Sequence, residues 1–305
     1  MTPFCAAVDW GTSSFRLWLL DGDGAVLAQR RSDEGMLAAS TAGFETVLER
    51  HLAALGVEPH LPVVVCGMAG ARQGWREAPY VDTPADLAQL PRRAIAVPGT
   101  RRDVRILPGI AQREAARPDV IRGEETQLLG LVETGTSSAL VCLPGTHCKW
   151  VELRDRRVEG FATFMTGELF SVIAKHSILR LAMGENAAVR ADSPAFADAV
   201  ESAFAAPQEI SARLFGLRAG QLLGHAQPDE AASRLSGLLI GLELAGATAR
   251  LGRLGQAVLV ATGDLASAYA RALELVGATV EGVDAETAVR RGLLRAARAI
   301  WSIDF

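Results

Sequence analysis

The chain has 305 residues, about twice the ~150 residues of an ordinary domain, so two domains are expected. Hydrophobic residues make up 49% of it and charged residues 22%, which excludes the disordered, collagen-like and disulfide-scaffold classes. Its 31 basic and 35 acidic side chains give a formal net charge of −4, so it lacks the broad basic surface that holds nucleic acid or anionic lipid. These numbers favour a small-molecule partner.

Nothing near the N-terminus resembles an export signal, because residues 1–9 contain neither a basic segment nor an uninterrupted apolar stretch. No apolar run approaches the ~20 residues that span a bilayer. The four cysteines have no C-x-x-C spacing, which predicts free thiols rather than disulfides or metal ligands: Cys5, Cys66, Cys142 and Cys148. We therefore expect a cytoplasmic protein without nucleic-acid or membrane partners, and a homodimer is left open.

The first half alternates predicted strands and helices, which is typical of an α/β fold. The predicted elements are strands at 4–10, 15–20, 25–28 and 62–67 and helices at 44–55 and 124–133. Residues 78–118 hold six of the 13 prolines, so we expect loops there with short strands near 94–97 and 104–107.

A predicted strand over 138–143 begins a second copy of the element order found at the N-terminus. This strand leads to Gly145-Thr146 as the first strand leads to Gly11-Thr12, and each pair is followed by a strand, a tight turn and another strand. An internal repeat with two like-folded domains, residues 1–122 and 123–283, explains this. The remaining predicted elements are helices at 169–183, 195–204, 210–223, 231–251 and 265–276 and a strand at 257–261. Residues 284–305, with a helix over 285–300, are expected to pack back on the first domain.

The segment from Asp9 to Ser14 joins two strands and has the composition of a phosphate-binding turn. Its backbone N–H groups can converge on an anion, and its hydroxyls add donors. The residues concerned are Gly11, Thr12, Ser13 and Ser14. Asp9 is placed to hold Mg²⁺ directly or through water. The alternative is an ordinary hairpin turn capped by the Asp side chain.

The corresponding turn at Gly145 and Thr146 strengthens the phosphate interpretation, because two such turns could grip adjacent phosphates of one nucleotide. Lys149 is one of only two lysines in the chain and could balance the phosphate charge, or it could point into solvent. A third glycine turn joins a strand to a helix and could admit an adenosine, although such junctions are common: Thr262, Gly263 and Asp264.

Two carboxylates, Glu124 and Glu125, begin the helix over 124–133. Phosphoryl transfer to a hydroxyl needs a carboxylate that orients and deprotonates it, and these two are the best candidates. The alternative is structural, because acidic residues are common at helix starts, where the dipole favours them.

Two further segments suit a polyhydroxylated acid. Arg72 could bind its carboxylate and Trp75 the apolar face of its carbon chain, unless Trp75 is ordinary packing. In the segment 165–168, the N–H groups of Thr166 and Gly167 could bind an anion, unless Thr166 only caps the helix.

Five segments, in order along both halves, resemble the superfamily of acetate and sugar kinases, heat-shock chaperone ATPases and actin, and more closely the 2-dehydro-3-deoxygalactonokinase family. They are residues 9–16, 67–75, 122–127, 143–150 and 164–170. The resemblance implies two ribonuclease-H-like domains, the actin-like ATPase fold, with an interdomain nucleotide cleft.

The same resemblance implies an enzyme, a phosphotransferase that uses ATP and Mg²⁺ to phosphorylate the 6-hydroxyl of 2-dehydro-3-deoxy-D-galactonate in galactonate breakdown. It assigns phosphate binding to both glycine-threonine turns and adenosine binding to residues 262–264. Substrate contacts are expected from residues in the shared segments: Arg16, Met68, Arg72, Trp75, Thr166, Gly167 and Glu168.

One departure concerns the catalytic base. Sugar kinases of the superfamily often use an Asp, whereas Glu124 resembles the Glu that exopolyphosphatases use on water, so Glu124 and Glu125 both stay candidates. Two other functions stay open: an exopolyphosphatase-like phosphohydrolase and a non-catalytic, ATP-responsive regulatory module. The first expects an extended basic channel, which a Lys-poor chain does not suggest, and the second needs no sugar-binding segment at 67–75.

Overall fold

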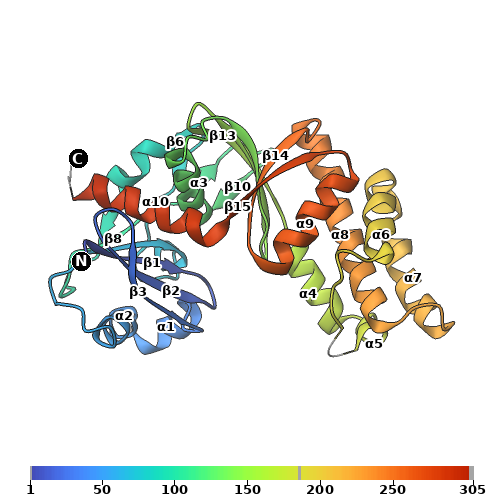
Figure 1. The fold of residues 1–305 in the computed structure, drawn as a ribbon, viewed down its shortest axis with the longest axis horizontal. Coiled ribbons are helices and arrows are strands. Elements are labelled where there is room, and N and C mark those ends of the chain that lie inside the picture. The colour runs from blue at the N-terminus through green and yellow to red at the C-terminus, as the bar shows by residue number, and fades with distance from the viewer. Residues whose placement is uncertain (1, 185–186, 302–305) are drawn as a thin grey trace. The chain divides into compact units, whose positions relative to one another are not determined.

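The structure, a computed structural model, describes residues 2–184 and 187–301 (Figure 1). The chain forms two compact units. The first unit comprises Met1–Ser138, Leu153–Gly160 and Ala285–Phe305, and the second comprises Ala139–Glu152 and Phe161–Asp284. Within the described residues, no helix combines the length and the apolar character that a membrane span requires.

The first unit is built on a six-stranded sheet with the strand order β3-β2-β1-β4-β8-β7. Its strands are β1 (Cys5–Trp10), β2 (Phe15–Leu20), β3 (Val26–Ser32), β4 (Val63–Gly67), β7 (Ile95–Ala96) and β8 (Val104–Ile106). The helices α1 (Met36–Ala42) and α2 (Phe44–Ala53) contribute Met36, Leu48 and Leu52 to the apolar core that this sheet builds with Trp10 and Phe15.

Two helices, α3 (Glu124–Glu133) and α10 (Ala285–Ile300), pack together within the first unit, and α10 also contacts β1 and β4. Their backbones approach closely because a side chain at Gly130 would collide with the carbonyl of Ala288, and one at Gly292 with that of Thr126. The first unit therefore extends to Ser138 and includes α3, whereas the sequence predicts a domain boundary between residues 122 and 123.

Short elements fill the proline-rich part of the first unit. They are η1 (Met68–Gly70), β5 (Val81–Asp82), β6 (Ala85–Asp86), η2 (Leu87–Arg93), β9 (Ile110–Gln112) and β10 (Asp119–Ile121). The predicted strands near 94–97 and 104–107 are present as β7 and β8. The other strands were not predicted, because two or three residues are too few to show an alternating pattern.

A second sheet, which lies mainly in the second unit, repeats the strand arrangement of the first. Its strands include β11 (Ala139–Leu143), β12 (Cys148–Arg154), β13 (Arg157–Phe164), β14 (Gln256–Ala261) and β15 (Thr279–Asp284). The end of β12 and the start of β13 fall in Leu153–Gly160, which belongs to the first unit. The order β13-β12-β11-β14-β15 matches β3-β2-β1-β4-β8 strand for strand, and the pairs β11–β14 and β14–β15 are parallel, as are β1–β4 and β4–β8. The predicted internal repeat is confirmed at the level of topology.

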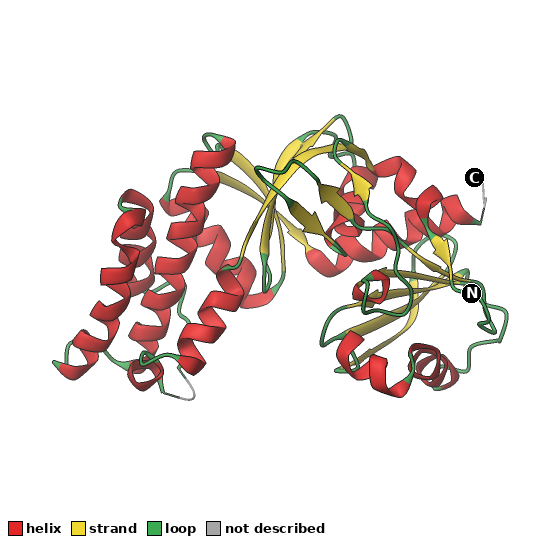
Figure 2. Ribbon diagram, turned by 180° about the vertical axis from the view of Figure 1, so that it is seen from behind, coloured by secondary structure: helices red, strands yellow, loops and turns green. Residues whose placement is uncertain are grey.

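Helices make up the rest of the second unit. They are α4 (Thr166–His176), α5 (Arg180–Met183), α6 (Pro194–Ala205), α7 (Ile210–Leu222), α8 (Pro228–Leu251) and α9 (Gly263–Leu275), with a short η3 (Pro207–Glu209). Both α6 and α7 pack on the long α8 (Figure 2). The single helix predicted over 169–183 is wrong, because extended backbone at Ser177 separates α4 from α5.

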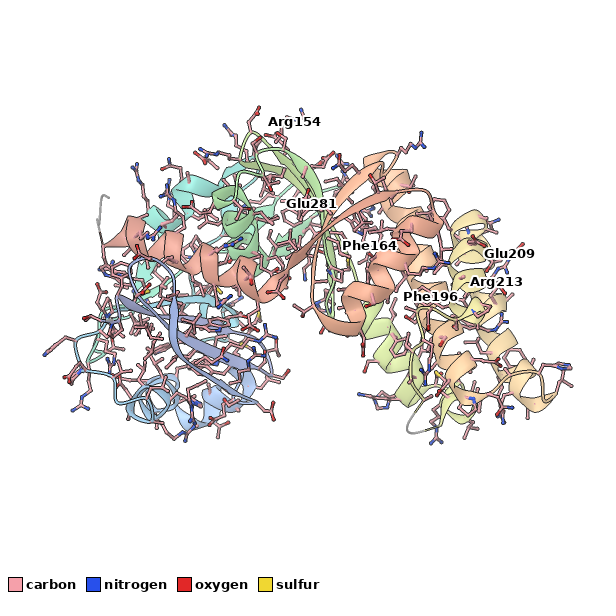
Figure 3. All side chains as sticks on the ribbon, viewed as in Figure 1. Arg154, Phe164, Phe196, Glu209, Arg213 and Glu281 are labelled. Atoms are coloured by element: carbon pink, nitrogen blue, oxygen red, sulfur yellow. The ribbon has the colours of Figure 1, made fainter. Side chains whose placement is uncertain are left out.

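Glycines on α8 allow neighbouring backbone and an aromatic ring to pack closely against the helix. A Cβ at Gly237 would lie 2.5 Å from the carbonyl oxygen of Phe196, and one at Gly246 would lie 2.9 Å from the ring of Phe164 (Figure 3). Phe196 is fully buried. The sheet and α8 are thereby held at a short, well-defined separation, which matters for the cavity described below.

Candidate active site

The first glycine-threonine turn, residues 11–14, is held by the start of α1. Gly11 N–H donates to Ser14 O (2.8 Å), and the N–H groups of Met36 and Leu37 donate to the carbonyls of Gly11 (2.9 Å) and Thr12 (3.1 Å). A Cβ at Gly35 would lie 2.5 Å from the backbone of Ser13, so only glycine fits there. Thr12 and Ser13 are exposed, which leaves their hydroxyls accessible to a ligand.

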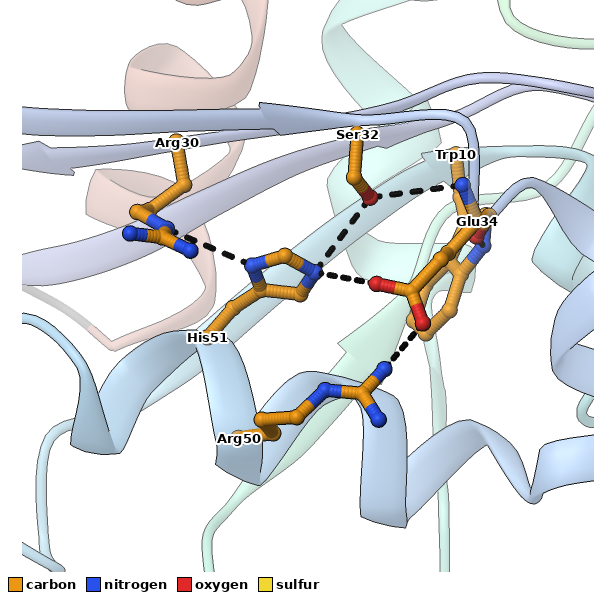
Figure 4. Close-up of polar contacts among 6 residues, drawn as sticks. All are labelled: Trp10, Arg30, Ser32, Glu34, Arg50 and His51. Carbon is orange, nitrogen blue, oxygen red and sulfur yellow. Dashed lines mark hydrogen bonds and ion pairs between the residues drawn. The ribbon is translucent and has the colours of Figure 1, made fainter.

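A polar network fixes Glu34, two residues before α1 (Figure 4). The Glu34 carbonyl accepts from Trp10 Nε1 (3.0 Å), and its carboxylate pairs with Arg50 and accepts from His51 Nε2 (2.9 Å). Although burial opposes it, the hydrogen bonds from His51 and Arg50 lower the pKa of Glu34. Arg30 Nε donates to His51 Nδ1 (3.4 Å), so the imidazole carries its proton on Nε2, facing Glu34.

Asp9 lies in β1, beside the first turn. Its Oδ2 lies 3.5 Å from Arg16 Nη1, and the thiol of Cys66 donates to its Oδ1 (3.8 Å). Burial raises the pKa of Asp9, Arg16 opposes this shift and the nearby Glu124 adds to it. A Cβ at Gly67 would lie 2.6 Å from Trp10 O and 3.5 Å from Asp9 Oδ1, so this glycine leaves the carboxylate room.

The two carboxylates that begin α3 differ in their surroundings. Glu125 is 1% exposed, and it accepts from Gly123 N–H (2.6 Å) and Thr126 Oγ1 (3.1 Å). Burial, and then the charge of Glu124, raise the pKa of Glu125 to about 8. Glu124 is half-buried and accepts from Arg122 N–H (3.0 Å), and its charge contributes to the raised pKa of Asp9. Glu125 thus stabilises the helix start, whereas Glu124 interacts electrostatically with the Asp9 carboxylate.

The segment predicted to contact substrate divides into exposed and packed residues. Arg72 is exposed, and Met68 is half-buried against the core of the first unit. Trp75 stacks on Phe44 with ring centroids 5.9 Å apart and lies 6.0 Å from Trp10. This arrangement favours the packing interpretation of Trp75.

Arg122 connects this segment to α3. Its guanidinium lies over the ring of Tyr80 (4.3 Å), and Nη2 donates to Ala78 O (2.9 Å). A Cβ at Gly70 would lie 2.8 Å from Nη1, so the cation sits directly against that glycine. Nε and Nη1 are buried, and neither has a hydrogen-bond partner among the described residues. The turn after β4 and Glu124 are therefore both held by Arg122, the turn by its side chain and Glu124 by its backbone N–H.

The second unit contains a cavity of about 380 Å³ that brings together residues from three predicted site segments, 143–150, 164–170 and 262–264. Its walls are mainly apolar, which suits a flat aromatic ligand, and a few polar groups stand among them. The lining residues are Gly145, Thr166, Gly167, Phe170, Ala188, Val189, Ser236, Leu239, Ile240, Asp264, Leu265, Ala268 and Tyr269.

The start of α4 packs directly on the second glycine-threonine turn. Glu168 N–H donates to Thr146 O (2.8 Å), and a side chain at Gly167 would collide with the Gly145 carbonyl. Glu168 also pairs with His147 (2.5 Å). Thr166 and Gly167, which the resemblance assigned to the sugar acid, therefore lie with the turn assigned to phosphate.

Lys149 does not point into solvent, so that alternative is wrong. It is 8% exposed, and its Nζ donates to the carbonyl of His147 (2.9 Å). In the third glycine turn, Thr262 is exposed and Gly263 has a φ of 60°, which favours glycine. Asp264, in the first turn of α9, lines the cavity.

Comparison with known proteins identifies the family. The family described as 2-keto-3-deoxy-galactonokinase matches residues 9–296. The chain belongs to this family. It is 56% identical, over 98% of both chains, to the Rhizobium meliloti protein named "Probable 2-dehydro-3-deoxygalactonokinase DgoK1". It is 33% identical to the 2-dehydro-3-deoxygalactonokinase of Escherichia coli, over 98% of this chain and 99% of that protein.

Solved structures support the fold of this 2-keto-3-deoxy-galactonokinase family member. A Sinorhizobium meliloti protein with 56% identity has a TM-score of 0.95 over 98% of this chain and 100% of its own. An activator of 2-hydroxyisocaproyl-CoA dehydratase from Clostridium difficile shares only 14% identity, with a TM-score of 0.53 over 98% and 96% of the two chains. The predicted two-domain α/β fold of the actin-like ATPases is confirmed.

Several polar residues of this kinase family member have structural roles that the sequence analysis missed. Glu34 and His51 support the first turn, and Arg122 packs beneath Gly70. Glu243, in the middle of α8, is buried below the cavity. A signal existed only for Arg122, which lies in a shared segment, because the other three stand in helices or loops without a motif.

Proposed function

We propose that the protein catalyses ATP-dependent phosphorylation of the 6-hydroxyl of 2-dehydro-3-deoxy-D-galactonate. Membership of the family and the names of the curated relatives support this substrate. The observation that carries the chemistry is an acidic pair: Asp9 lies in β1 next to the turn of residues 11–14, and the charge of Glu124 raises the pKa of Asp9. Two neighbouring carboxylates next to an anion-binding turn suit the transfer of a phosphoryl group to a hydroxyl.

Glu124 is proposed as the general base. It is half-buried and its charge raises the pKa of Asp9, so we propose that it orients the substrate hydroxyl and accepts its proton. Glu125 is proposed as a structural neighbour, because its two oxygens already accept from Gly123 and Thr126. The charge of Arg122 opposes the rise in the pKa of Glu125.

Mg²⁺ fits the residues of the first unit. Asp9 and Glu124 offer carboxylate oxygens, which this cation prefers, and their mutual repulsion would be relieved by a positive charge. Asp9 would hold the ion, directly or through water. When bound, Mg²⁺ would neutralise charge on the phosphates.

ATP is proposed to occupy the cavity of the second unit. Its apolar lining suits the adenine ring, and Gly145 and Gly167 line the cavity, where their backbone can meet phosphate oxygens. Asp264 stands at the first turn of α9 and can accept from hydroxyls of the ribose. In this proposal Thr166 and Gly167 act on the nucleotide rather than on the sugar acid, while Arg16 and Arg72 stay candidates for the substrate carboxylate.

A coupled ADP-release assay across a panel of 2-oxo-3-deoxy sugar acids tests the function. We expect turnover with the galactonate-derived acid and, by phosphorus NMR, a product phosphorylated at C6. Glu124→Gln is expected to remove this activity. ADP release that does not depend on any acid would instead favour the phosphohydrolase, and ATP binding without turnover would favour the regulatory module.

Two further expectations accompany this function. We propose a cytoplasmic location, because the reaction consumes ATP, and cell fractionation measures it. The homodimer stays a prediction, which light scattering on the purified chain checks.

A further inference from the structure

We propose that Glu243, a buried residue of α8, is a positioning residue of the nucleotide site, where it holds Thr166 and Tyr269 in the cavity wall. This inference rests on the proposed binding of ATP in the second unit. It assigns a role in that site to a residue that lies outside the five shared segments and does not line the cavity.

The carboxylate of Glu243 is an acceptor for donors on three different elements. It is 2% exposed. Its Oε1 accepts from Trp150 Nε1 on β12 (2.9 Å), and its Oε2 accepts from Tyr269 OH on α9 (2.7 Å) and from Thr166 Oγ1 at the start of α4. Each hydrogen bond offsets part of the cost of burying the carboxylate, so each oxygen holds its own donors in place.

The two oxygens of Glu243 serve different parts of the unit. Both donors to Oε2, Thr166 and Tyr269, line the cavity, whereas Trp150, the donor to Oε1, does not. Thr166 directly precedes Gly167, whose backbone lies against the Gly145 carbonyl. The orientation of Thr166 therefore governs how the start of α4 meets the second glycine-threonine turn.

A buried metal site is the competing explanation for this cluster, because candidate ligand atoms of Cys142, Cys148 and Glu243 lie within 4.8 Å of one another. Metal ligation needs thiolates. Burial raises the pKa of both thiols above its ordinary value, and the Glu243 oxygens already accept from Trp150, Thr166 and Tyr269. The contacts therefore favour a hydrogen-bonded support over a cation site.

Matched variants on the full-length chain separate positioning from simple stabilisation. Tyr269→Phe and Thr166→Val each remove one donor to Oε2, and Glu243→Gln replaces the acceptor. Trp150→Phe is the control, because it removes a donor to the same carboxylate from outside the cavity. All four variants are expected to lower the melting temperature, since each removes a buried hydrogen bond.

Calorimetric titration with the non-hydrolysable analogue ADPNP, well below each melting temperature, gives the decisive readout. We expect Tyr269→Phe and Thr166→Val to weaken binding about three- to tenfold, as loss of one hydrogen bond allows, and Glu243→Gln about tenfold or more. Trp150→Phe should change it less than about twofold. In turnover assays the KM for ATP should rise while the KM for the sugar acid stays constant.

Two results would overturn the positioning role: wild-type ADPNP affinity in Tyr269→Phe and Thr166→Val, or an equal loss in Trp150→Phe. If Glu243→Gln does not fold, the other three variants still decide. A wild-type chain that binds no ADPNP would remove the proposed nucleotide site, and the role of Glu243 with it. Wild-type binding with unaffected variants would remove only the role of Glu243.

Discussion

The two glycine-threonine turns occupy equivalent places in two units of matching topology, yet their supports differ. The first turn is tied to the start of α1, and Glu34, two residues before α1, pairs with Arg50 and His51 near the surface. The second is packed against the start of α4, above the buried carboxylate of Glu243. Burial raises the pKa of Glu243, whereas the hydrogen bonds of Glu34 lower its pKa despite partial burial.

The same backbone turn thus occurs in both units with different side chains around it. In the first unit Asp9 lies next to the turn, and the charge of Glu124 raises the pKa of Asp9. In the second unit an apolar cavity adjoins it. We therefore expect changes in the first unit to act mainly on kcat and changes in the second to act mainly on nucleotide affinity.

The largest effect is expected from the carboxylates of the first unit. Asp9→Asn should abolish turnover, and Glu124→Gln should lower kcat by about 10²- to 10⁴-fold, as loss of a general base does. Glu125→Gln should lower it by a smaller factor, because that side chain is buried. Steady-state kinetics measure this, with the exposed Asp23→Asn as the control. An Asp9→Asn variant that keeps its kcat and changes only the KM for ATP would contradict the division of roles.

A smaller effect is expected from the glycines that support each turn. Gly35→Ala would press on the backbone of Ser13, and Gly167→Ala on that of Gly145. Each should lower the free energy of unfolding by about 1–3 kcal/mol, as overpacking does. Gly35→Ala should reduce kcat, and Gly167→Ala should raise the KM for ATP. Chemical denaturation and kinetics check both, and Gly282→Ala, which meets no atom within 4 Å, should be neutral. Equal effects of both substitutions on kcat and on the KM for ATP would contradict the different roles of the two units.

The smallest effects concern the pH dependence of stability. Glu125 has a raised pKa of about 8 in the folded chain against an ordinary value of 4.5. Its contribution to the free energy of unfolding is therefore present at low pH and is lost as the pH rises through this range. Glu34 has a lowered pKa, so its contribution is lost as the pH falls. In Glu125→Gln the free energy of unfolding should therefore fall less steeply toward pH 8. In Glu34→Gln it should fall less steeply as the pH drops into the acid range.

Urea denaturation between about pH 3.5 and 8.5 measures both slopes. Glu152→Gln removes an exposed carboxylate of β12 and should leave them unchanged. A Glu125→Gln variant that keeps the wild-type slope toward pH 8 would show that Glu125 is already ionised in the folded chain.

The repeat and its turns could be predicted from the sequence because local composition determines them. A strand followed by Gly-Thr and a second strand reads the same way at Gly11 and Gly145, and the structure places both between paired strands. The start of α3 at Glu124 and the strand β14 were also predictable from local pattern.

Features that depend on distant contacts could not be predicted. Adjacent residues such as Glu124 and Glu125 look equivalent until packing buries one of them. Glu243 lies in the middle of a long helix, and only its contacts with Trp150 and Tyr269 reveal its place. The strand β15 is largely exposed and contains a glycine and three acidic or hydroxyl residues, so its composition resembles a loop.

The place of α10 in the first unit has a consequence for synthesis on the ribosome. The helix α10, which packs on α3, β1 and β4, is synthesised after the second unit. The first unit is therefore completed only after all strands and helices of the second unit have been made. During translation, the face of α3 that packs on α10 therefore stays uncovered until α10 has been made.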